Sequence, residues 1–277
     1  MDKYKQIVNK NLEKYINIKS SKLHESALYS LKSPGKRLRP TLLLSSYEAM
    51  GGSKNNPLPF ACAVEMIHAY SLVHDDLPAM DNDNLRRGKP TNHVIFGEDI
   101  AILTGDILLN QAYETMTKYC RNNLNKKNLL AMEIISRASG NMVSGQTFDI
   151  LADIEQIKPE QLFLIHKNKT AKLIQASILA GAVLATTNKK KLNYLAKAGM
   201  YMGLAFQIKD DYLDATQTEK ESGKTNSDFR NKKSTYVSLF GLDKSLKDSN
   251  ICKQKAIKIL NDINLKTKDL QTIAQKI

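Results

Sequence analysis

This chain of 277 residues has few cysteines and no long apolar run. Both features limit the classes of protein to which it can belong. Its three cysteines, Cys62, Cys120 and Cys252, stand far apart without a CxxC pair, which favours free thiols in a reducing compartment over a metal site. The N-terminus has no apolar segment of the kind found in secretory signals. The longest apolar stretch, Leu173 to Ala185, is too short to span a bilayer. We therefore expect a cytoplasmic protein without a membrane span.

The chain also lacks the patterns of β-structure, linkers and repeats. No alternating β-branched run predicts a strand, and no proline- or serine-rich stretch or repeat of fixed period divides the sequence. Apolar residues instead recur three and four apart, which predicts helices. These are expected over Tyr4 to Ile16, Pro40 to Met50, Phe60 to His74, Asp99 to Tyr119, Leu129 to Ser144, Pro159 to His166, Thr170 to Ala185, Leu192 to Asp214 and, more weakly, Leu246 to Ile277. We expect a single all-α domain, residues 1–277, with a helical bundle around a central cavity.

The chain is basic, since 41 Lys and Arg residues against 28 Asp and Glu give a formal net charge of +13. Nucleic acid, an anionic membrane surface or a small anionic substrate would each suit that charge. Much of the excess is scattered lysine, as in Lys126-Lys127 and Lys189-Lys190-Lys191, which is typical of solvated helix faces. There is no tryptophan and no basic patch interleaved with aromatic residues, so we expect no nucleic-acid partner.

Two aspartate-rich segments lie at the ends of expected apolar helices. The first contains Asp75, Asp76 and Asp81, and the second contains Asp210, Asp211 and Asp214. Asp210 and Asp214 are one helical turn apart and share a face, with Asp211 to the side in support. Asp75 and Asp81 would lie on different faces of a regular helix, but Pro78 interrupts it and lets Asp81 return beside Asp75.

Clustered carboxylates repel one another unless a cation neutralises them, and hard ions such as Mg²⁺ prefer oxygen ligands. An acidic turn or a helix cap would explain one such cluster more easily than two. The first cluster is followed at once by Arg86-Arg87-Gly88. Two carboxylate clusters beside a double arginine predict a polyphosphate bridged by metal.

The two clusters resemble the aspartate-rich motifs of the short-chain isoprenyl (polyprenyl) diphosphate synthases. Asp75 to Gly88 is similar to their first motif, DDxxxxD followed by an arginine pair, and Asp210 to Asp214 to their second, DDxxD. Further segments agree in order: Gly35 to Pro40, Glu65 to His68, Gly145-Gln146 with Asp149, Lys169-Thr170, Phe206-Gln207 and Gly223-Lys224. The matches cover about residues 20 to 240, and they resemble the bacterial-type farnesyl diphosphate synthases.

The resemblance implies an isoprenoid-synthase-type bundle, a homodimer, and a trans-prenyltransferase that joins isopentenyl diphosphate head to tail to an allylic diphosphate. It implies that Asp75, Asp76, Asp81, Asp210 and Asp214 hold Mg²⁺, three ions in all. Isopentenyl diphosphate would bind Lys36, Arg39, His68 and Arg87, and the allylic diphosphate would bind Arg86, Lys169, Thr170, Gln207 and Lys224. Lys169, Thr170 and Gln207 are then the expected catalytic residues, near the reacting carbon and its leaving oxygen.

Some of these residues also have simpler explanations. Arg37 and Arg39 could be helix-start charges, although arginine there opposes the helix macrodipole, and that mismatch favours an anion site. His68 alone would suit a core histidine, and Thr170 a helix cap. Lys224 would otherwise be an ordinary surface lysine.

Product length should depend on what closes the bottom of the hydrocarbon pocket. Tyr70 and Ser71 lie five and four residues before Asp75, about one helical turn (~6 to 8 Å) deeper. A tyrosine there resembles the farnesyl-producing members, in which an aromatic ring stops growth at fifteen carbons. We expect a C15 product, with C20 or C10 as alternatives and an ordinary core tyrosine as the simpler explanation.

The sequence departs from the family pattern at a few places. Pro34 replaces a usual glycine, Asn84 a common aspartate and Val237 a common proline. The family's usual C-terminal arginine is absent, and Lys276 would be a weak substitute. The loop around Lys224 is the part that these departures affect most.

Two other classes of protein are alternatives to a prenyl diphosphate synthase. His68, His74 and Asp75 are similar to the metal residues of HD-type phosphohydrolases, but that class leaves Asp210 to Asp214 and the arginine pair unexplained. A non-catalytic chain, either a basic helical nucleic-acid binder or the inactive subunit of a synthase, is the other. An inactive subunit should lack one aspartate motif, and both are present.

Overall fold

The computed structural model describes residues 2–54, 56–152, 157–218, 234–263 and 267–277, and these are almost entirely helical. The elements are α1 (Asp2–Leu12), the 3₁₀-helix η1 (Glu13–Tyr15), α2 (Ser21–Lys32), α3 (Leu38–Ala49), α4 (Leu58–Asp75), β1 (Leu85–Arg86), β2 (Lys89–Pro90), α5 (Asn92–Phe96), α6 (Glu98–Asn122), α7 (Lys126–Ala152), α8 (Pro159–Ile165), the π-helix η2 (His166–Ala171), α9 (Lys172–Ala185), α10 (Lys189–Thr216), α13 (Tyr236–Phe240), α14 (Leu242–Asp262) and α15 (Lys268–Lys276). Within these ranges no helix combines the length and the apolar character needed to cross a membrane.

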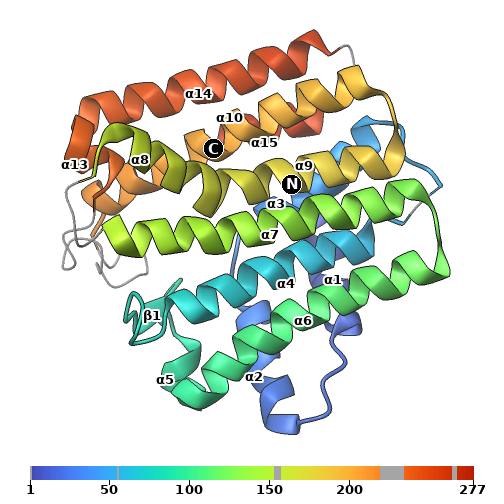
Figure 1. Cartoon of the computed structure of the whole chain (residues 1–277), viewed down its shortest axis with the longest axis vertical. Helices are drawn as coiled ribbons and strands as arrows, with labels where there is room; N and C mark the ends of the chain where they lie inside the picture. The colour runs from blue at the N-terminus through green and yellow to red at the C-terminus, as the bar shows by residue number, and fades with distance from the viewer. Residues whose placement is uncertain (1, 55, 153–156, 219–233, 264–266) are drawn as a thin grey trace.

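Helix α9 lies at the centre of the bundle, with α10 on one side and α7 on the other (Figure 1). It also packs against α3, so little of its surface meets water. Its apolar residues therefore extend around the whole helix instead of forming one stripe, as expected for a helix covered on all sides. Outside this layer, α4 packs against α6, and α10 packs against α14.

Two apolar clusters form the core, and α9 contributes to both. Leu173 and Ala180 belong to the cluster around α4, α6 and α7, while Ile174 and Ile178 belong to the one around α10, α14 and α15. A side chain buried to this degree stabilises the fold by about 1.5–3 kcal/mol relative to an exposed one. The two clusters hold the helices that carry the aspartate segments, α4 and α10, on either side of a shared space.

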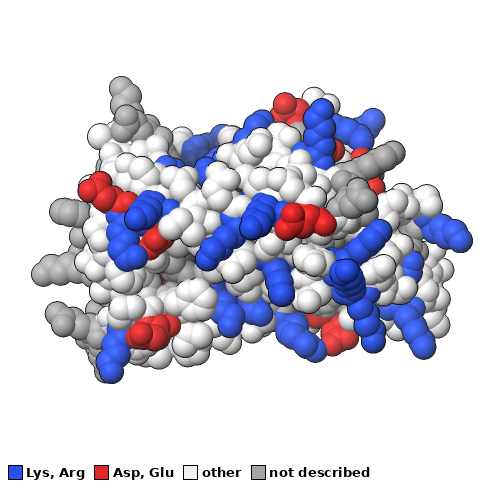
Figure 2. All heavy atoms as spheres, turned by 90° about the horizontal axis from the view of Figure 1, so that it is seen from above, with Lys and Arg blue, Asp and Glu red and all other residues white. Residues whose placement is uncertain are grey.

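Basic side chains are spread over the surface instead of gathering in one patch. Figure 2 shows Lys and Arg distributed across one face with Asp and Glu between them. Several are paired locally, such as Arg137 with Glu133 and Lys244 with Asp248, both four residues apart on one helix. This distribution agrees with the expectation of solvated helix faces.

The all-α fold expected from the sequence is confirmed, and the structure adds several features. Helix α2, the short helices α5 and α13, and the short antiparallel hairpin β1–β2 were not expected. The two helices expected over 159–166 and 170–185 form one rod, because the π-helix η2 joins them. Thr170 lies inside that rod, so the explanation of Thr170 as a helix cap is wrong.

Candidate active site

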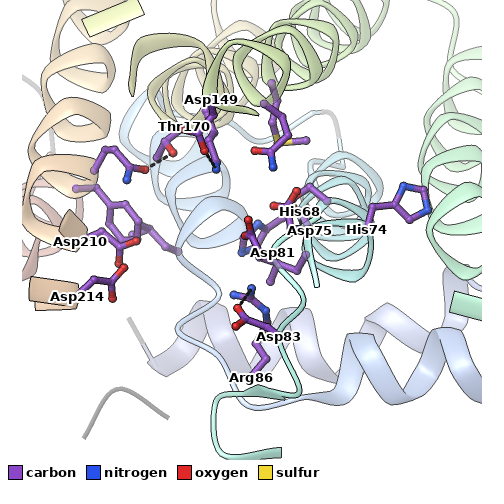
Figure 3. A pocket seen from close by; sticks show the side chains of 18 of the residues that line it. His68, His74, Asp75, Asp81, Asp83, Arg86, Asp149, Thr170, Asp210 and Asp214 are labelled. Atoms are coloured by element: carbon purple, nitrogen blue, oxygen red, sulfur yellow. Dashed lines mark hydrogen bonds and ion pairs between the residues drawn. The ribbon is translucent and has the colours of Figure 1, made fainter. Parts of the chain in front are cut away.

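A cavity of about 870 Å³ opens between α3, α4, α7, η2 and α10. Asp75 and Asp81 line one wall, and Asp210 and Asp214 line another (Figure 3). Segments far apart in the sequence therefore present their carboxylates to one space. The structure brings the two aspartate clusters together, as the sequence predicts.

The first aspartate wall is built where α4 ends. The helix stops at Asp75, and the chain reverses so that the Asp81 amide donates to the Asp75 carbonyl oxygen across 2.9 Å. Pro78 has no amide hydrogen with which to continue the helical bonding. Asn82 takes a left-handed conformation, with φ at 54°, in the same reversal. Asp81 thus returns beside Asp75, in agreement with the expectation from Pro78.

Asp76 points away from this wall and pairs with Arg86. Its Oδ1 accepts from Arg86 Nε at 2.6 Å and contacts Nη2 at 2.5 Å, and Asp83 lies 3.6 Å from the same Nη2. Burial works against the charge of Arg86, but the neighbouring carboxylates raise its pKa and keep it protonated. Arg86 lines the cavity, whereas Asp76 does not. The prediction of Asp76 as a metal ligand does not fit this arrangement, in which its carboxylate orients Arg86.

The second aspartate wall lies on α10. Asp210 and Asp214 face the cavity one turn apart, and Asp211, buried beside them, accepts from the Tyr236 amide at 2.6 Å. His166 Nε2 lies 3.2 Å from the same carboxylate. Burial alone would raise the pKa of Asp211, but the hydrogen bond from His166 contributes most to lowering it. Asp211 supports the wall from the side, as the sequence predicts, while His166 was not foreseen.

A chain of hydrogen bonds connects Asp211 to Thr170. The carboxylate accepts from Gln207 Nε2 at 2.9 Å, and Gln207 Oε1 accepts from the Thr170 hydroxyl at 2.5 Å. Because the side-chain amide nitrogen of Gln207 donates to Asp211, its amide oxygen faces Thr170. The hydroxyl proton is therefore committed to Gln207, and Thr170 presents oxygen lone pairs to the cavity that it lines.

Lys169 and Thr170 reach the cavity through the π-helix η2, which lies close to α7. A Cβ built on Gly145 would lie nearer than 3.0 Å to the backbone of Lys169, so glycine allows this approach. Lys169 forms an ion pair with Asp149 of α7. The predicted catalytic set of Lys169, Thr170 and Gln207 thus shares one wall. Lys224 lies outside the described residues.

The four residues predicted for isopentenyl diphosphate, Lys36, Arg39, His68 and Arg87, all line this cavity. Arg39 is buried, and its Nε has no hydrogen-bond partner among the described residues. Burial lowers the pKa of Arg39 to about 10, and burial followed by the charges of Arg39 and Arg87 lowers the pKa of His68 well below its usual value. Arg39 remains charged and His68 neutral at pH 7. An anion would satisfy the buried Arg39 guanidinium and attract the cations beside it.

Arg37 behaves differently from Arg39. Its guanidinium donates to Glu65 at 2.8 Å, to Asn9 at 2.9 Å, and to the carbonyl oxygens of Leu31 and Ser33. All of these donors are used inside the protein, and Arg37 and Glu65 are both buried. These contacts favour a structural role for Arg37 over the suggested anion-binding role, because this arginine ties the loop before α3 to α4.

Tyr70 and Ser71 also line the cavity, one turn before Asp75 on α4. The Tyr70 side chain is almost completely buried and packs edge-on against His74. Ser71 donates to the His68 carbonyl oxygen at 3.0 Å. His68 and His74 both border the cavity, but Figure 3 shows the His74 side chain extending away from His68. The two histidines therefore do not meet as the HD-type phosphohydrolase alternative requires.

The residues present fit a hard divalent ion. Four carboxylates, those of Asp75, Asp81, Asp210 and Asp214, face the same cavity, and such oxygen donors suit Mg²⁺. In the described part of the chain, no three His, Cys, Asp or Glu side chains are already gathered around one point that could hold a metal. A ligand with several anionic oxygens would complete the coordination, which Mg²⁺ commonly takes from substrate phosphates.

Comparison with known proteins agrees with this geometry. Residues 20–276 match the model of the polyprenyl synthetase family. The chain is 41% identical to the farnesyl diphosphate synthase of Bacillus subtilis (strain 168), over 94% of this chain and 91% of that one. It is 43% identical to the geranylgeranyl diphosphate synthase of Cyanophora paradoxa, over 91% and 86%. The structure of a geranyltransferase from Helicobacter pylori, complexed with magnesium and isoprenyl diphosphate, superposes with a TM-score of 0.87 at 30% identity, over 99% and 94%.

Fold and site together define a trans-prenyltransferase of isoprenoid biosynthesis. The chain belongs to the polyprenyl synthetase family and is a short-chain prenyl diphosphate synthase. The family match removes the phosphohydrolase alternative and the alternative of a non-catalytic chain. Farnesyl and geranylgeranyl synthases both occur among its relatives, so the product length has to come from the cavity itself.

Proposed function

We propose that this protein is a farnesyl diphosphate synthase. It condenses isopentenyl diphosphate with dimethylallyl diphosphate, and then with geranyl diphosphate, to give a C15 product and diphosphate. The observation that carries the product length is Tyr70, a buried aromatic side chain in the cavity wall one turn below Asp75. A hydrocarbon chain that grows down α4 from the aspartates meets this ring.

The cations of the cavity hold the two diphosphates apart. Arg86 and Lys169, with Lys224, bind the allylic diphosphate, while Lys36, Arg39, His68 and Arg87 bind isopentenyl diphosphate. Asp75, Asp81, Asp210 and Asp214 would hold Mg²⁺, and we infer three ions. When bound, these ions neutralise the charge that develops on the leaving diphosphate.

The allylic C1–O bond breaks with its electron pair on the diphosphate, and the isopentenyl double bond attacks C1. A proton then leaves the new chain for the released diphosphate, so no histidine or glutamate base is needed. Thr170 presents an oxygen, held by Gln207, toward the positive charge at C1, which is electrostatic stabilisation by a preorganised dipole. The apolar lower cavity excludes water, which would otherwise capture the cation.

Replacing Tyr70 with alanine is expected to make C20 or longer products predominate, because the smaller side chain opens the bottom of the cavity. Labelled isopentenyl diphosphate is incubated with each allylic starter and Mg²⁺, and products are sized by chromatography after dephosphorylation. Tyr70→Phe, which keeps the ring, is the matched control and should retain C15. An unchanged distribution in Tyr70→Ala would refute the assignment, and no condensation by the parent with any starter would refute the function.

We also infer a homodimer, which α6 supports. Ile102 and Leu103 stand side by side there with 47% and 51% of their surface exposed, an apolar pair that a partner subunit would cover. Sedimentation of the parent should give the mass of two 31.1-kDa chains, and Leu103→Glu should give one. A monomeric parent at micromolar concentration would contradict the inference.

A further inference from the structure

The His74 side chain lies between Tyr70 and helix α6. Its imidazole packs edge-on against the Tyr70 ring, with 6.0 Å between centroids and an interplanar angle of 80°. On the other side, Nε2 lies 2.9 Å from the Ile102 carbonyl oxygen and 3.9 Å from Asp106 Oδ1. Figure 3 shows His74 projecting away from Asp75 and His68. The mechanism above uses none of these contacts.

Gly105 provides the space that the imidazole occupies. A Cβ built at this position would lie nearer than 3.0 Å to three ring atoms of His74, a separation that real Cβ atoms essentially never show. The histidine ring therefore fills the place where another residue of α6 would carry its side chain. With the Ile102 carbonyl beside it, α6 fixes both how far and in which direction the ring extends from α4.

We propose that Gly105 and His74 are positioning residues for product length, which hold the Tyr70 ring at its place in the cavity wall. The proposal rests on the proposed function, which assigns the stop to Tyr70. The imidazole is confined by Tyr70 on one side and by α6 on the other, so a displacement of one ring is transmitted to the other. A side chain at position 105 must push the imidazole from α6 toward Tyr70, and Tyr70 toward the cavity. Loss of the imidazole would instead let the Tyr70 ring move away from the cavity, into the space that the imidazole had filled.

The two directions give opposite expected products. In Gly105→Ala the cavity becomes shorter, and we expect the C10 fraction to rise about threefold or more, since an added methyl group in a packed site forces its neighbours to shift. In His74→Ala the cavity becomes longer, and C20 should increase at the expense of C15. The double variant should resemble His74→Ala, because the new methyl group then has no ring to displace, and such non-additivity marks residues in contact.

The chain offers a matched control in Gly140→Ala on α7. A Cβ at that position meets nothing within 4 Å, so the same change in a helix should leave the products as in the parent. Product sizes are measured with labelled isopentenyl diphosphate and dimethylallyl diphosphate for all variants, with Tyr70→Ala beside them. If Tyr70→Ala leaves the products unchanged, the stop itself is misassigned.

The positioning role is refuted if Tyr70→Ala lengthens the product while Gly105→Ala gives the same products as Gly140→Ala. It is also refuted if Gly105→Ala lengthens the product. In both cases the assignment of Tyr70 as the stop is retained. If Gly105→Ala does not fold, His74→Ala decides alone: a longer product supports the role, and an unchanged one refutes it. A general structural role for Gly105 would lower activity without changing product size.

Discussion

Replacing Asp210 with asparagine is expected to reduce condensation about 10³-fold or more, the scale on which loss of one preorganised charged or polar group slows catalysis. Asp210 lines the cavity wall opposite Asp75 and Asp81, and the amide that replaces its carboxylate has nearly the same size. The side chain loses its negative charge, and with it most of its affinity for a hard divalent ion. Initial rates with labelled isopentenyl diphosphate at saturating substrate and Mg²⁺ measure the loss.

Asp243→Asn is the matched control, because this exposed aspartate in the first turn of α14 does not line the cavity. Its rate should equal that of the parent. Chelation of divalent ions should abolish the activity of the parent, and added Mg²⁺ should restore it. Retention of more than a tenth of parental activity by Asp210→Asn, with the control unaffected, would remove Asp210 from the metal site.

The longer helices other than α2, and both aspartate walls, follow from local sequence. Apolar spacing marks the helices, the four-residue interval of Asp210 and Asp214 places them on one face, and Pro78 accounts for the return of Asp81. Each of these features depends on residues within about two helical turns of one another. Local rules are sufficient at that range, and the structure agrees with them.

The contacts of individual charged side chains could not be predicted from local sequence, because they depend on residues that are distant in the chain. Arg37 and Arg39 are two residues apart in one basic segment, yet Arg37 pairs with Glu65 while Arg39 Nε has no hydrogen-bond partner among the described residues. Asp75 and Asp76 are adjacent, yet Asp76 pairs with Arg86 while Asp75 lines the cavity. The two residues of each pair carry the same charge and lie in the same segment of the sequence. The different contacts that they make therefore depend on how the other helices pack around them.

His166 had a signal that was available in the sequence. His166 and Thr170 are four residues apart on one rod, and Gln207 and Asp211 are four apart on α10. Two polar pairs of this spacing, each among apolar residues of one helix face, indicate that the helices face each other through them. The structure places the two pairs in contact, His166 with Asp211 and Thr170 with Gln207.

Replacing Arg39 with glutamine is expected to lower kcat/KM for isopentenyl diphosphate about 10²- to 10³-fold, because truncating one partner of a buried charged pair costs about 2–5 kcal/mol of binding. Arg39 is buried in the cavity wall, and its Nε has no partner among the described residues. The KM for the allylic substrate should change little, since Arg86 and Lys169 line other parts of the cavity. Steady-state kinetics with each substrate varied in turn measure the difference.

Folding stability separates Arg39 from its neighbour Arg37. Burial lowers the pKa of Arg39, so its charge is disfavoured in the folded protein, and Arg39→Gln should not lower the free energy of unfolding. Arg37→Gln leaves the buried Glu65 carboxylate unpaired and should lower that free energy by about 3–5 kcal/mol. Arg137→Gln, at an exposed pair, should change neither stability nor kinetics. If Arg39→Gln raised both substrates' KM equally, or unfolded as readily as Arg37→Gln, Arg39 would be a structural arginine and the isopentenyl diphosphate site would lie elsewhere.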